Sequence, residues 1–179
     1  GRTPKVLYVD GSKQILEHGV LVMEYLPGHA MDYHTELMLA APCLADIHSV
    51  PIPESEEILV HPQNPLKAIL EECEEMFKVY LESPLGDGEK KIYIRELLDL
   101  GWKREAEIQL ESGYQCCINT ELNSTNLLIN GEGKSNYLID WEKPLFGNPA
   151  QDLGHFLAPT TTFWKTDVIL TSEEMEKFI

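Results

Sequence analysis

The pattern of apolar residues changes at Gly113, and this change constrains the fold more than any other feature of the chain. Before Gly113, apolar residues recur at helical spacing, most clearly over residues 66–81. After it, short apolar runs at 114–118, 127–129 and 137–139 alternate with polar loops. Short strands set among helices predict an α+β fold that is mainly helical and carries its loops on short β-hairpins.

The N-terminal part predicts a strand over 6–9, a turn at 10–13 and a second strand over 20–25 that ends before Pro27 and Gly28. A helical segment over 33–50 follows, and we expect it to kink or restart at Pro42, which has no N–H to donate. Further elements are expected as helices over 66–81 and 93–110, a turn at 130–133 between two strands, and a helix opened by the capping box Thr171–Glu174.

Composition narrows the classes of function. Thirty acidic residues against fourteen basic ones give a formal charge of −16, which argues against a nucleic-acid partner. The same charge fits a cationic substrate or plain solubility. No apolar run reaches the ~18 residues of a membrane span, and no signal peptide is visible. Four cysteines without zinc-type spacing fit reduced thiols in the cytoplasm.

A polar loop between two strands carries the residue types that phosphoryl transfer needs. Glu121 and Asn126 lie five residues apart in this loop, and Asp140 follows at the end of the next hairpin. An acid beside the acceptor hydroxyl orients it and takes its proton, while carboxylate and amide oxygens hold magnesium against the nucleotide phosphates. On spacing alone, an ordinary polar loop fits as well, so both interpretations stay open.

Several of these stretches resemble motifs of the aminoglycoside phosphotransferases and choline kinases. Residues 119–126 resemble their His-Gly-Asp-(x)4-Asn catalytic loop, and 139–142 resemble their metal-binding Ile-Asp-Trp/Phe-Glu motif. Residues 21–28 resemble their adenine hinge, and 44–49 resemble the helix that follows it. Asp152, in Asp-Leu-Gly, resembles the aspartate that braces the catalytic loop. Five motifs stand in the family's order.

The resemblance runs from about Pro4 to Phe156, although residues 52–113 match only in helical character. It implies a protein-kinase-like fold, ATP as the phosphoryl donor, Mg²⁺, and a small-molecule acceptor such as an aminoglycoside or a choline-like compound. Amino-acid and sugar acceptors stay open too. It also implies that Asp152 and His48 are structural and that Trp141 serves packing.

The resemblance also implies the nucleotide and metal residues. Asn126 and Asp140 would bind Mg²⁺. Glu24 and Leu26 would offer backbone groups to adenine, with Met23 behind the ring.

Two substitutions depart from the family pattern. Glu121 stands where the family has its catalytic aspartate, and Asn119 stands two residues earlier in place of the histidine. Glutamate keeps the charge but adds one methylene. It is therefore either a working but repositioned base or a mark of lost activity. Three functions stay open: a small-molecule phosphotransferase, a pseudokinase-like nucleotide-binding or regulatory module, and an interaction domain without a ligand.

The resemblance also predicts where the chain divides into two parts. Residues 1–27 would be a remnant of the N-terminal lobe strands with the hinge, and 28–179 would be the helical catalytic lobe. No Gly-rich loop or strand lysine precedes the hinge, and the last capping box stands close to Ile179. We expect a fragment of a longer protein or a naturally reduced one.

Overall fold

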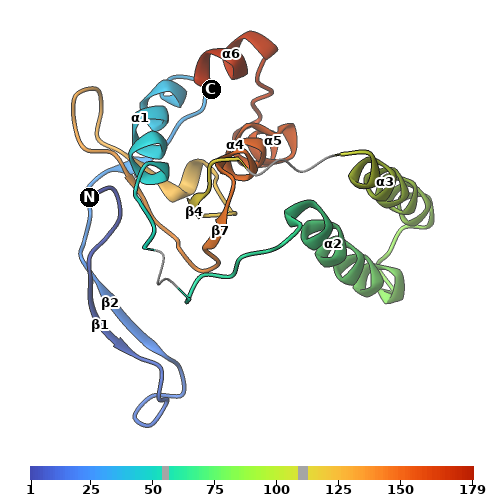
Figure 1. Cartoon of the computed structure of the whole chain (residues 1–179), viewed down its shortest axis with the longest axis horizontal. Helices are drawn as coiled ribbons and strands as arrows, with labels where there is room; N and C mark the ends of the chain where they lie inside the picture. Colours follow the sequence, from blue (N-terminus) through green and yellow to red (C-terminus); the bar gives the residue numbers. More distant parts are fainter. Residues whose placement is uncertain (54–56, 109–112) are drawn as a thin grey trace. The chain divides into compact units, whose positions relative to one another are not determined.

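The computed structural model describes residues 1–53, 57–108 and 113–179. These residues form two compact units, one made of residues 1–60 with 114–179 and the other of residues 61–113 (Figure 1). The predicted division at residue 27 differs from this one and stays an expectation. Within the described residues, no helix is long and apolar enough to cross a membrane.

The smaller unit is a pair of helices, α2 (Pro65–Glu82) and α3 (Gly88–Glu107). Asn64 begins α2, because its side chain accepts a hydrogen bond from the Lys67 N–H, and a proline follows at the first helical position. Asp87 caps α3 in the same way through the Lys90 N–H. This cap explains why α3 begins five residues before the predicted helix at 93–110. Both predicted helices are present, although α3 ends at Glu107 and positions 109 and 110 of the prediction lie outside the described residues.

A carboxylate at the middle of α2 joins the two helices. The Glu74 carboxylate accepts two hydrogen bonds from the Arg95 guanidinium, at 2.9 and 2.6 Å, and one from the Trp102 indole N–H at 3.0 Å. Planar two-point pairing of this kind fixes orientation as well as distance. It therefore sets how α2 and α3 pack.

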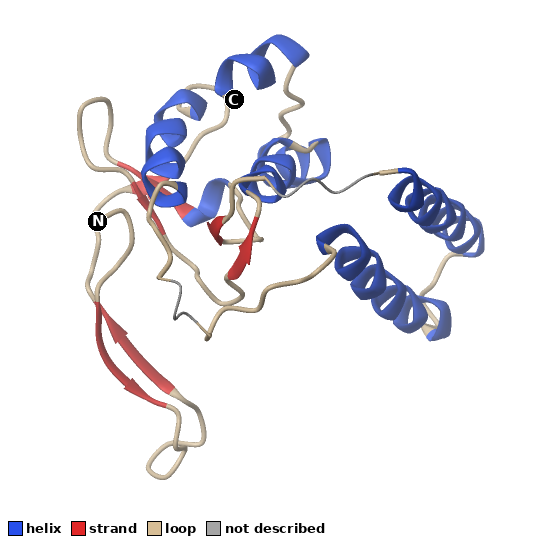
Figure 2. Ribbon diagram, viewed as in Figure 1, coloured by secondary structure: helices blue, strands red, loops and turns tan. Residues whose placement is uncertain are grey.

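The described residues of the larger unit form three small antiparallel sheets, β1–β2, β3–β5–β6 and β4–β7 (Figure 2). Its strands are β1 (Val6–Asp10), β2 (Val20–Met23), β3 (His29–Ala30), β4 (Cys116–Ile118), β5 (Leu127–Ile129), β6 (Tyr137–Leu138) and β7 (Leu145–Gly147). Its helices are α1 (Leu37–His48), α4 (Pro149–Leu157), α5 (Pro159–Thr166) and α6 (Ser172–Phe178), with a 3-10 turn η1 (Ser124–Asn126).

One core holds α1, β5, β6, α4 and α6 together. Phe156 lies at its centre, fully buried, with ring centroids 5.2 Å from Tyr33 and 5.5 Å from Phe178. The Tyr33 hydroxyl donates a hydrogen bond to the Phe156 carbonyl at 2.9 Å. Trp141 packs against the same core, and its indole N–H donates to the Leu138 carbonyl. Trp141 is thus a packing residue, as predicted.

Two predicted elements differ in their bounds. The predicted helix 33–50 begins only at Leu37, because the Asp32 carboxylate accepts hydrogen bonds from the His34 N–H and the Thr35 hydroxyl and holds a turn there. The helix then runs through Pro42 without restarting. Pro42 lies in the middle of α1, where its missing N–H leaves the Met38 carbonyl without its usual donor. The predicted strand 20–25 stops at Met23.

Other predicted features are confirmed. The turn at 130–133 joins β5 to β6, and the capping box is present in both directions between Thr171 and Glu174. All four cysteines are free thiols. Burial raises the pKa of the Cys43 and Cys116 thiols to about 11, so both stay protonated at neutral pH.

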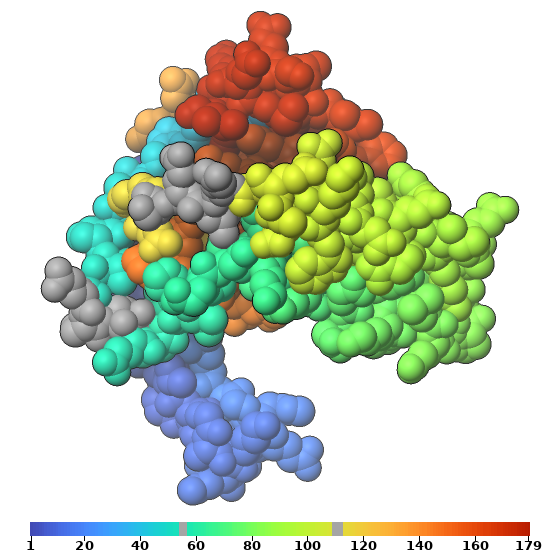
Figure 3. All heavy atoms as spheres, turned by 45° about the vertical axis from the view of Figure 1, so that its right-hand side comes forward, coloured from blue at the N-terminus to red at the C-terminus, as the bar shows by residue number. Residues whose placement is uncertain are grey.

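The β1–β2 hairpin exposes apolar side chains that in most proteins would be covered. Leu7, Val9 and Leu21 are each more than half exposed. In Figure 3 the atoms of this ribbon, in blue, lie open on the face in view. A two-stranded ribbon has too little buried surface to be stable on its own.

We predict that Phe156→Ala lowers the free energy of unfolding by about 3–5 kcal/mol, because it removes a buried ring from the centre of the core. Urea unfolding followed by circular dichroism measures the change. Phe163→Ala is the matched control, since Phe163 lies in the neighbouring helix α5 and is more than half exposed. Equal losses in the two variants would contradict the assignment of the core.

We also predict a pH dependence in the smaller unit. The hydrogen bonds from Arg95, and then from Trp102, lower the pKa of Glu74 from its ordinary 4.5 to about 2. The stabilisation is therefore complete above pH 4.5 and is lost as the pH falls towards 2. The difference in Tm between the wild type and Glu74→Gln should narrow over this window. Glu75→Gln, an exposed neighbour paired with Lys78, should show no such narrowing.

Candidate active site

A buried carboxylate on α4 braces the polar loop that follows β4. Asp152 is 1% exposed, and its Oδ2 accepts a hydrogen bond from the Asn119 N–H at 2.9 Å. Its Oδ1 accepts from the Thr120 N–H at 2.7 Å. The ring Nε2 of His48, from α1, lies 2.9 Å from Oδ2. The loop is thus tied to two helices through one side chain, and the structural roles predicted for Asp152 and His48 are confirmed.

The backbone turns sharply at Thr120, which adopts φ 72°. A β-branched residue rarely adopts positive φ, so this conformation persists only where surrounding bonds impose it. The Thr120 N–H is held by Asp152, and its hydroxyl donates to the Lys143 carbonyl at 3.0 Å. Strained backbone of this kind clusters at functional sites, and the next residue here is Glu121.

Asn119 links the loop to the end of the β6 hairpin. Its side chain is 1% exposed, its Nδ2 donates to the Asp140 carbonyl at 2.7 Å, and its Oδ1 accepts from the Glu121 N–H at 3.2 Å. One amide supplies both the donor and the acceptor. The sequence marked Asn119 only as a departure from a family pattern. Its role as a link depends on burial, which the sequence does not reveal.

Asn126 is held by the same loop. It is 6% exposed, and its Nδ2 donates to the Glu121 carbonyl at 3.1 Å. Its own carbonyl accepts from the Ile139 N–H at 2.9 Å, so Asn126 lies beside the residue that precedes Asp140. The Asn123 side chain also donates to the Glu121 carbonyl. Asn126 is therefore hydrogen-bonded directly to the Glu121 backbone, and it is connected to Asp140 through the neighbouring Ile139.

The pair Asn126 and Asp140 fits a magnesium ion carried by a nucleotide. Asp140 is exposed to solvent, and its backbone adopts φ 65°. In the described ranges, no group donates a hydrogen bond to its carboxylate. The Asn126 Nδ2 is engaged, and its Oδ1 accepts one long hydrogen bond from the Thr125 hydroxyl at 3.4 Å, which leaves that oxygen a second lone pair for a ligand. The described residues contain no cluster of three His, Cys, Asp or Glu side chains that suits a metal ion. Magnesium bound through substrate phosphates and water needs only one or two protein ligands.

A lysine lies beside the predicted base. The Lys143 Nζ is 3.3 Å from the Glu121 Oε1, and the two side chains are 60% and 41% exposed. The sequence did not single out Lys143, and no spacing rule joins positions 121 and 143. Their approach depends on the turn at Thr120 and on the pairing of β7 with β4.

The predicted adenine-binding residues lie at the end of β2. Met23 is the last residue of the strand and is about half exposed. The Glu24 N–H donates to the Lys5 carbonyl at 2.8 Å, which leaves the Glu24 carbonyl as the group available to a ligand. In the described part of the chain, no group accepts a hydrogen bond from the Leu26 N–H. An acceptor and a donor two residues apart suit the edge of a purine.

The segment after these residues is joined to the β5–β6 hairpin. The Asn130 side chain donates to the Pro27 carbonyl at 3.0 Å, and β3 pairs with β5. Gly28 adopts φ 135°, and a Cβ there would lie 3.0 Å from the Cβ of Leu128, so glycine is required at this close approach. Leu128 is half-buried and was not among the predicted site residues.

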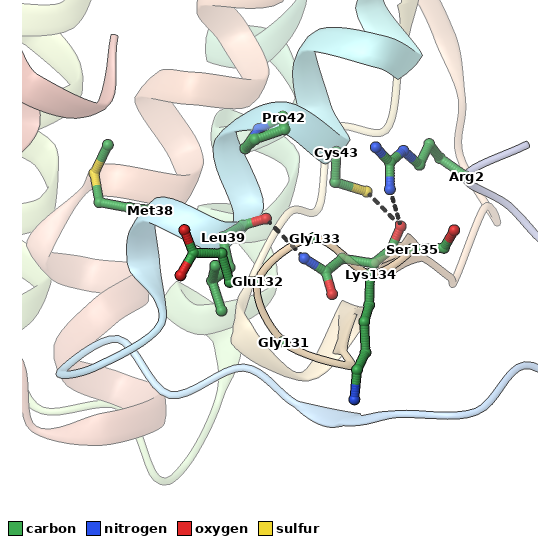
Figure 4. Close-up of a pocket in the computed structure, with 11 residues that line it drawn as sticks. Arg2, Met38, Leu39, Pro42, Cys43, Gly131, Glu132, Gly133, Lys134 and Ser135 are labelled. Atoms are coloured by element: carbon green, nitrogen blue, oxygen red, sulfur yellow. Dashed lines mark hydrogen bonds between the residues drawn. The ribbon is translucent and has the colours of Figure 1, made fainter.

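A cavity of this unit lies apart from the predicted residues. It measures about 670 Å³ and lies between α1 and the turn 131–136 (Figure 4). The Cys43 thiol and the Arg2 guanidinium both donate to the Asn136 carbonyl at its wall, each at 3.3 Å. None of the predicted catalytic, hinge or metal residues lines it. It therefore forms no part of the candidate active site.

Comparison with known proteins identifies relatives of the chain. A model of the phosphotransferase enzyme family matches residues 1–171. A search of curated proteins found no match.

Solved structures share the fold. AMP-bound spectinomycin phosphotransferase has a TM-score of 0.64 at 16% identity, over 99% of this chain and 60% of that one. A choline kinase from Streptococcus pneumoniae has 0.62 at 22%, over 99% and 55%. An ethanolamine kinase from Plasmodium vivax has 0.66 at 17%, over 98% and 51%. The predicted α+β, kinase-like fold is confirmed, and the chain spans 51–60% of these proteins.

We predict that Asp152→Asn releases the loop. An amide cannot accept at both of its heteroatoms, so at least one buried donor among the two N–H groups and the His48 ring loses its partner, at a cost of about 1–3 kcal/mol. Hydrogen exchange should accelerate at the Asn119 and Thr120 amides. Asp46→Asn, an exposed carboxylate paired with Arg2, is the control. Unchanged protection of both amides in Asp152→Asn would contradict the brace.

Proposed function

The chain belongs to the phosphotransferase enzyme family, and from this membership we propose that it acts as an ATP-dependent kinase on a hydroxyl group of a small polar molecule. The observation that carries the proposal is the hydrogen-bonded loop around Asn119. This loop links the backbones of Glu121 and Asp140 and connects both to Asn126. A base and a metal ligand held in one frame are what phosphoryl transfer requires of a protein.

In the proposed reaction, the acceptor hydroxyl lies against the Glu121 carboxylate, which orients it and takes its proton. The acceptor oxygen forms a bond to the terminal phosphorus of ATP as the bond from that phosphorus to the bridging oxygen breaks. ADP leaves with the electron pair of the broken bond. The protein contributes position and charge rather than covalent chemistry.

The family resemblance implies the proposed cofactor roles, and the groups that these residues offer support them. Asn126 and Asp140 would hold Mg²⁺, which neutralises charge on the phosphates when it is bound. The Glu24 carbonyl and the Leu26 N–H would receive the adenine edge, with Met23 beside the ring. ATP as donor is supported by nucleotide-bound structures of a relative, since spectinomycin phosphotransferase is bound to AMP in one structure and to ADP and spectinomycin in a second.

The acceptor is proposed only as a class. Relatives of this fold include kinases of spectinomycin, choline and ethanolamine, all of which offer hydroxyl groups. The net charge of −16 favours a cationic molecule among these, because a negative field raises its local concentration. A panel of aminoglycosides, choline and ethanolamine is therefore the first set of acceptors to test.

A second candidate is a nucleotide-binding or regulatory module without turnover. It is favoured by Glu121, whose extra methylene displaces the carboxylate relative to aspartate. A displacement near 1 Å can lower a rate by about 10²-fold. Both candidates require a nucleotide site, and only the first requires transfer to an acceptor.

We predict that Mg-ATP raises the Tm of the wild-type protein and that Asp140→Ala abolishes this shift. At a ligand concentration of 100 times Kd, binding stabilises the folded state by about 2.7 kcal/mol. Asp46→Ala, an exposed carboxylate outside the loop, should keep the shift. Differential scanning fluorimetry with Mg-ATP, ATP with a chelator, and Mg²⁺ alone separates the nucleotide from the metal. A folded wild type that shows no shift would contradict both candidates.

A further inference from the structure

The backbone of Glu121 is fixed more firmly than its side chain. The Asn119 side chain accepts from its N–H, and the Asn123 and Asn126 side chains both donate to its carbonyl. The side chain is 41% exposed, and the ammonium group of Lys143 is its ion-pair partner. Among the described residues, Lys143 is the one that the structure shows paired with this carboxylate.

A glutamate needs such a partner more than an aspartate does. Its side chain has one more rotatable bond, so a fixed backbone leaves the carboxylate a wider range of positions. A base must stay within about 0.5 Å of its productive position to be effective. An ion pair at 3.3 Å restricts this range without covering the carboxylate, whose side chain stays partly exposed.

Lys143 is itself anchored to the loop that it restrains. The Thr120 hydroxyl donates to the Lys143 carbonyl at 3.0 Å, and Thr120 precedes Glu121 directly. Two residues beyond Lys143, β7 begins and pairs with β4, the strand that leads into the loop. The lysine thus contacts the loop at both its backbone and its ammonium group.

We propose that Lys143 is a positioning residue for phosphoryl transfer, which holds the carboxylate of Glu121 where the acceptor hydroxyl arrives. This inference rests on the proposed kinase function. Partly exposed ion pairs contribute little to stability, so the pair acts through geometry and the fold does not depend on it.

The test compares Lys143→Met, Lys143→Arg and the matched control Lys134→Met in transfer of phosphate from ATP to the acceptor that gives turnover. Lys134 is an exposed lysine in the turn between β5 and β6. We expect Lys143→Met to lower kcat by about 10- to 100-fold with less than a twofold change in the KM for ATP. Lys143→Arg should recover most of the loss, and Lys134→Met should match the wild type.

A kcat of Lys143→Met within twofold of the wild type, or a loss confined to KM, would overturn the positioning role. A loss that Lys143→Arg does not relieve would overturn it too, because arginine retains the charge. Circular dichroism and Tm of each variant show that the comparison is made on folded protein.

A second readout separates this inference from the proposed function. NMR relaxation of isotope-labelled glutamate side-chain carbons measures how ordered the Glu121 side chain is, and this measurement requires no turnover. Lys143→Met should disorder this side chain, and Lys143→Arg should not. Equal order in all variants overturns the inference. A wild type that transfers no phosphate to any acceptor overturns the kinase function, while the relaxation data still decide whether Lys143 holds Glu121.

Discussion

The hydrogen bonds accepted by the buried Asp152 carboxylate are the interaction on which the candidate site depends. They hold the Asn119 and Thr120 amides, and the His48 ring closes the arrangement from α1. A carboxylate buried to this degree is stable only when its oxygens are satisfied, so the loop and the two helices require one another. One of the braced amides belongs to Thr120, whose positive φ directly precedes Glu121.

Side-chain amides connect the other residues of the site to the braced loop. The Asn119 side chain donates a hydrogen bond to the Asp140 carbonyl, and the Asn126 side chain donates one to the Glu121 carbonyl. These hydrogen bonds join neighbouring segments of the site. Among the described residues, no buried side-chain nitrogen or oxygen lacks a hydrogen bond. Satisfied networks of this kind are rigid. Rigidity suits a loop whose proposed task is to hold a base and a metal ligand at fixed separation.

Much of this arrangement could be predicted from the sequence, because its signals are local. Helical spacing predicted α2 and α3, the capping box predicted α6, and motif order predicted the kinase-like fold. The predicted helix 33–50 begins before the observed start of α1 at Leu37, because the side-chain turn at Asp32 competes with helix formation. The pairing of Lys143 with Glu121 and the double role of Asn119 depend on tertiary contacts, and neither has a sequence signature.

The central claim is that Glu121 is a working base, and transfer of labelled phosphate from ATP by the wild type and Glu121→Gln tests it most directly. Glutamine keeps the length of the side chain but cannot take a proton. The account predicts transfer by the wild type and a loss of about 10²–10⁴-fold in Glu121→Gln, with Mg-ATP binding retained. Equal rates in the two proteins, or binding of Mg-ATP without transfer by either, would contradict it.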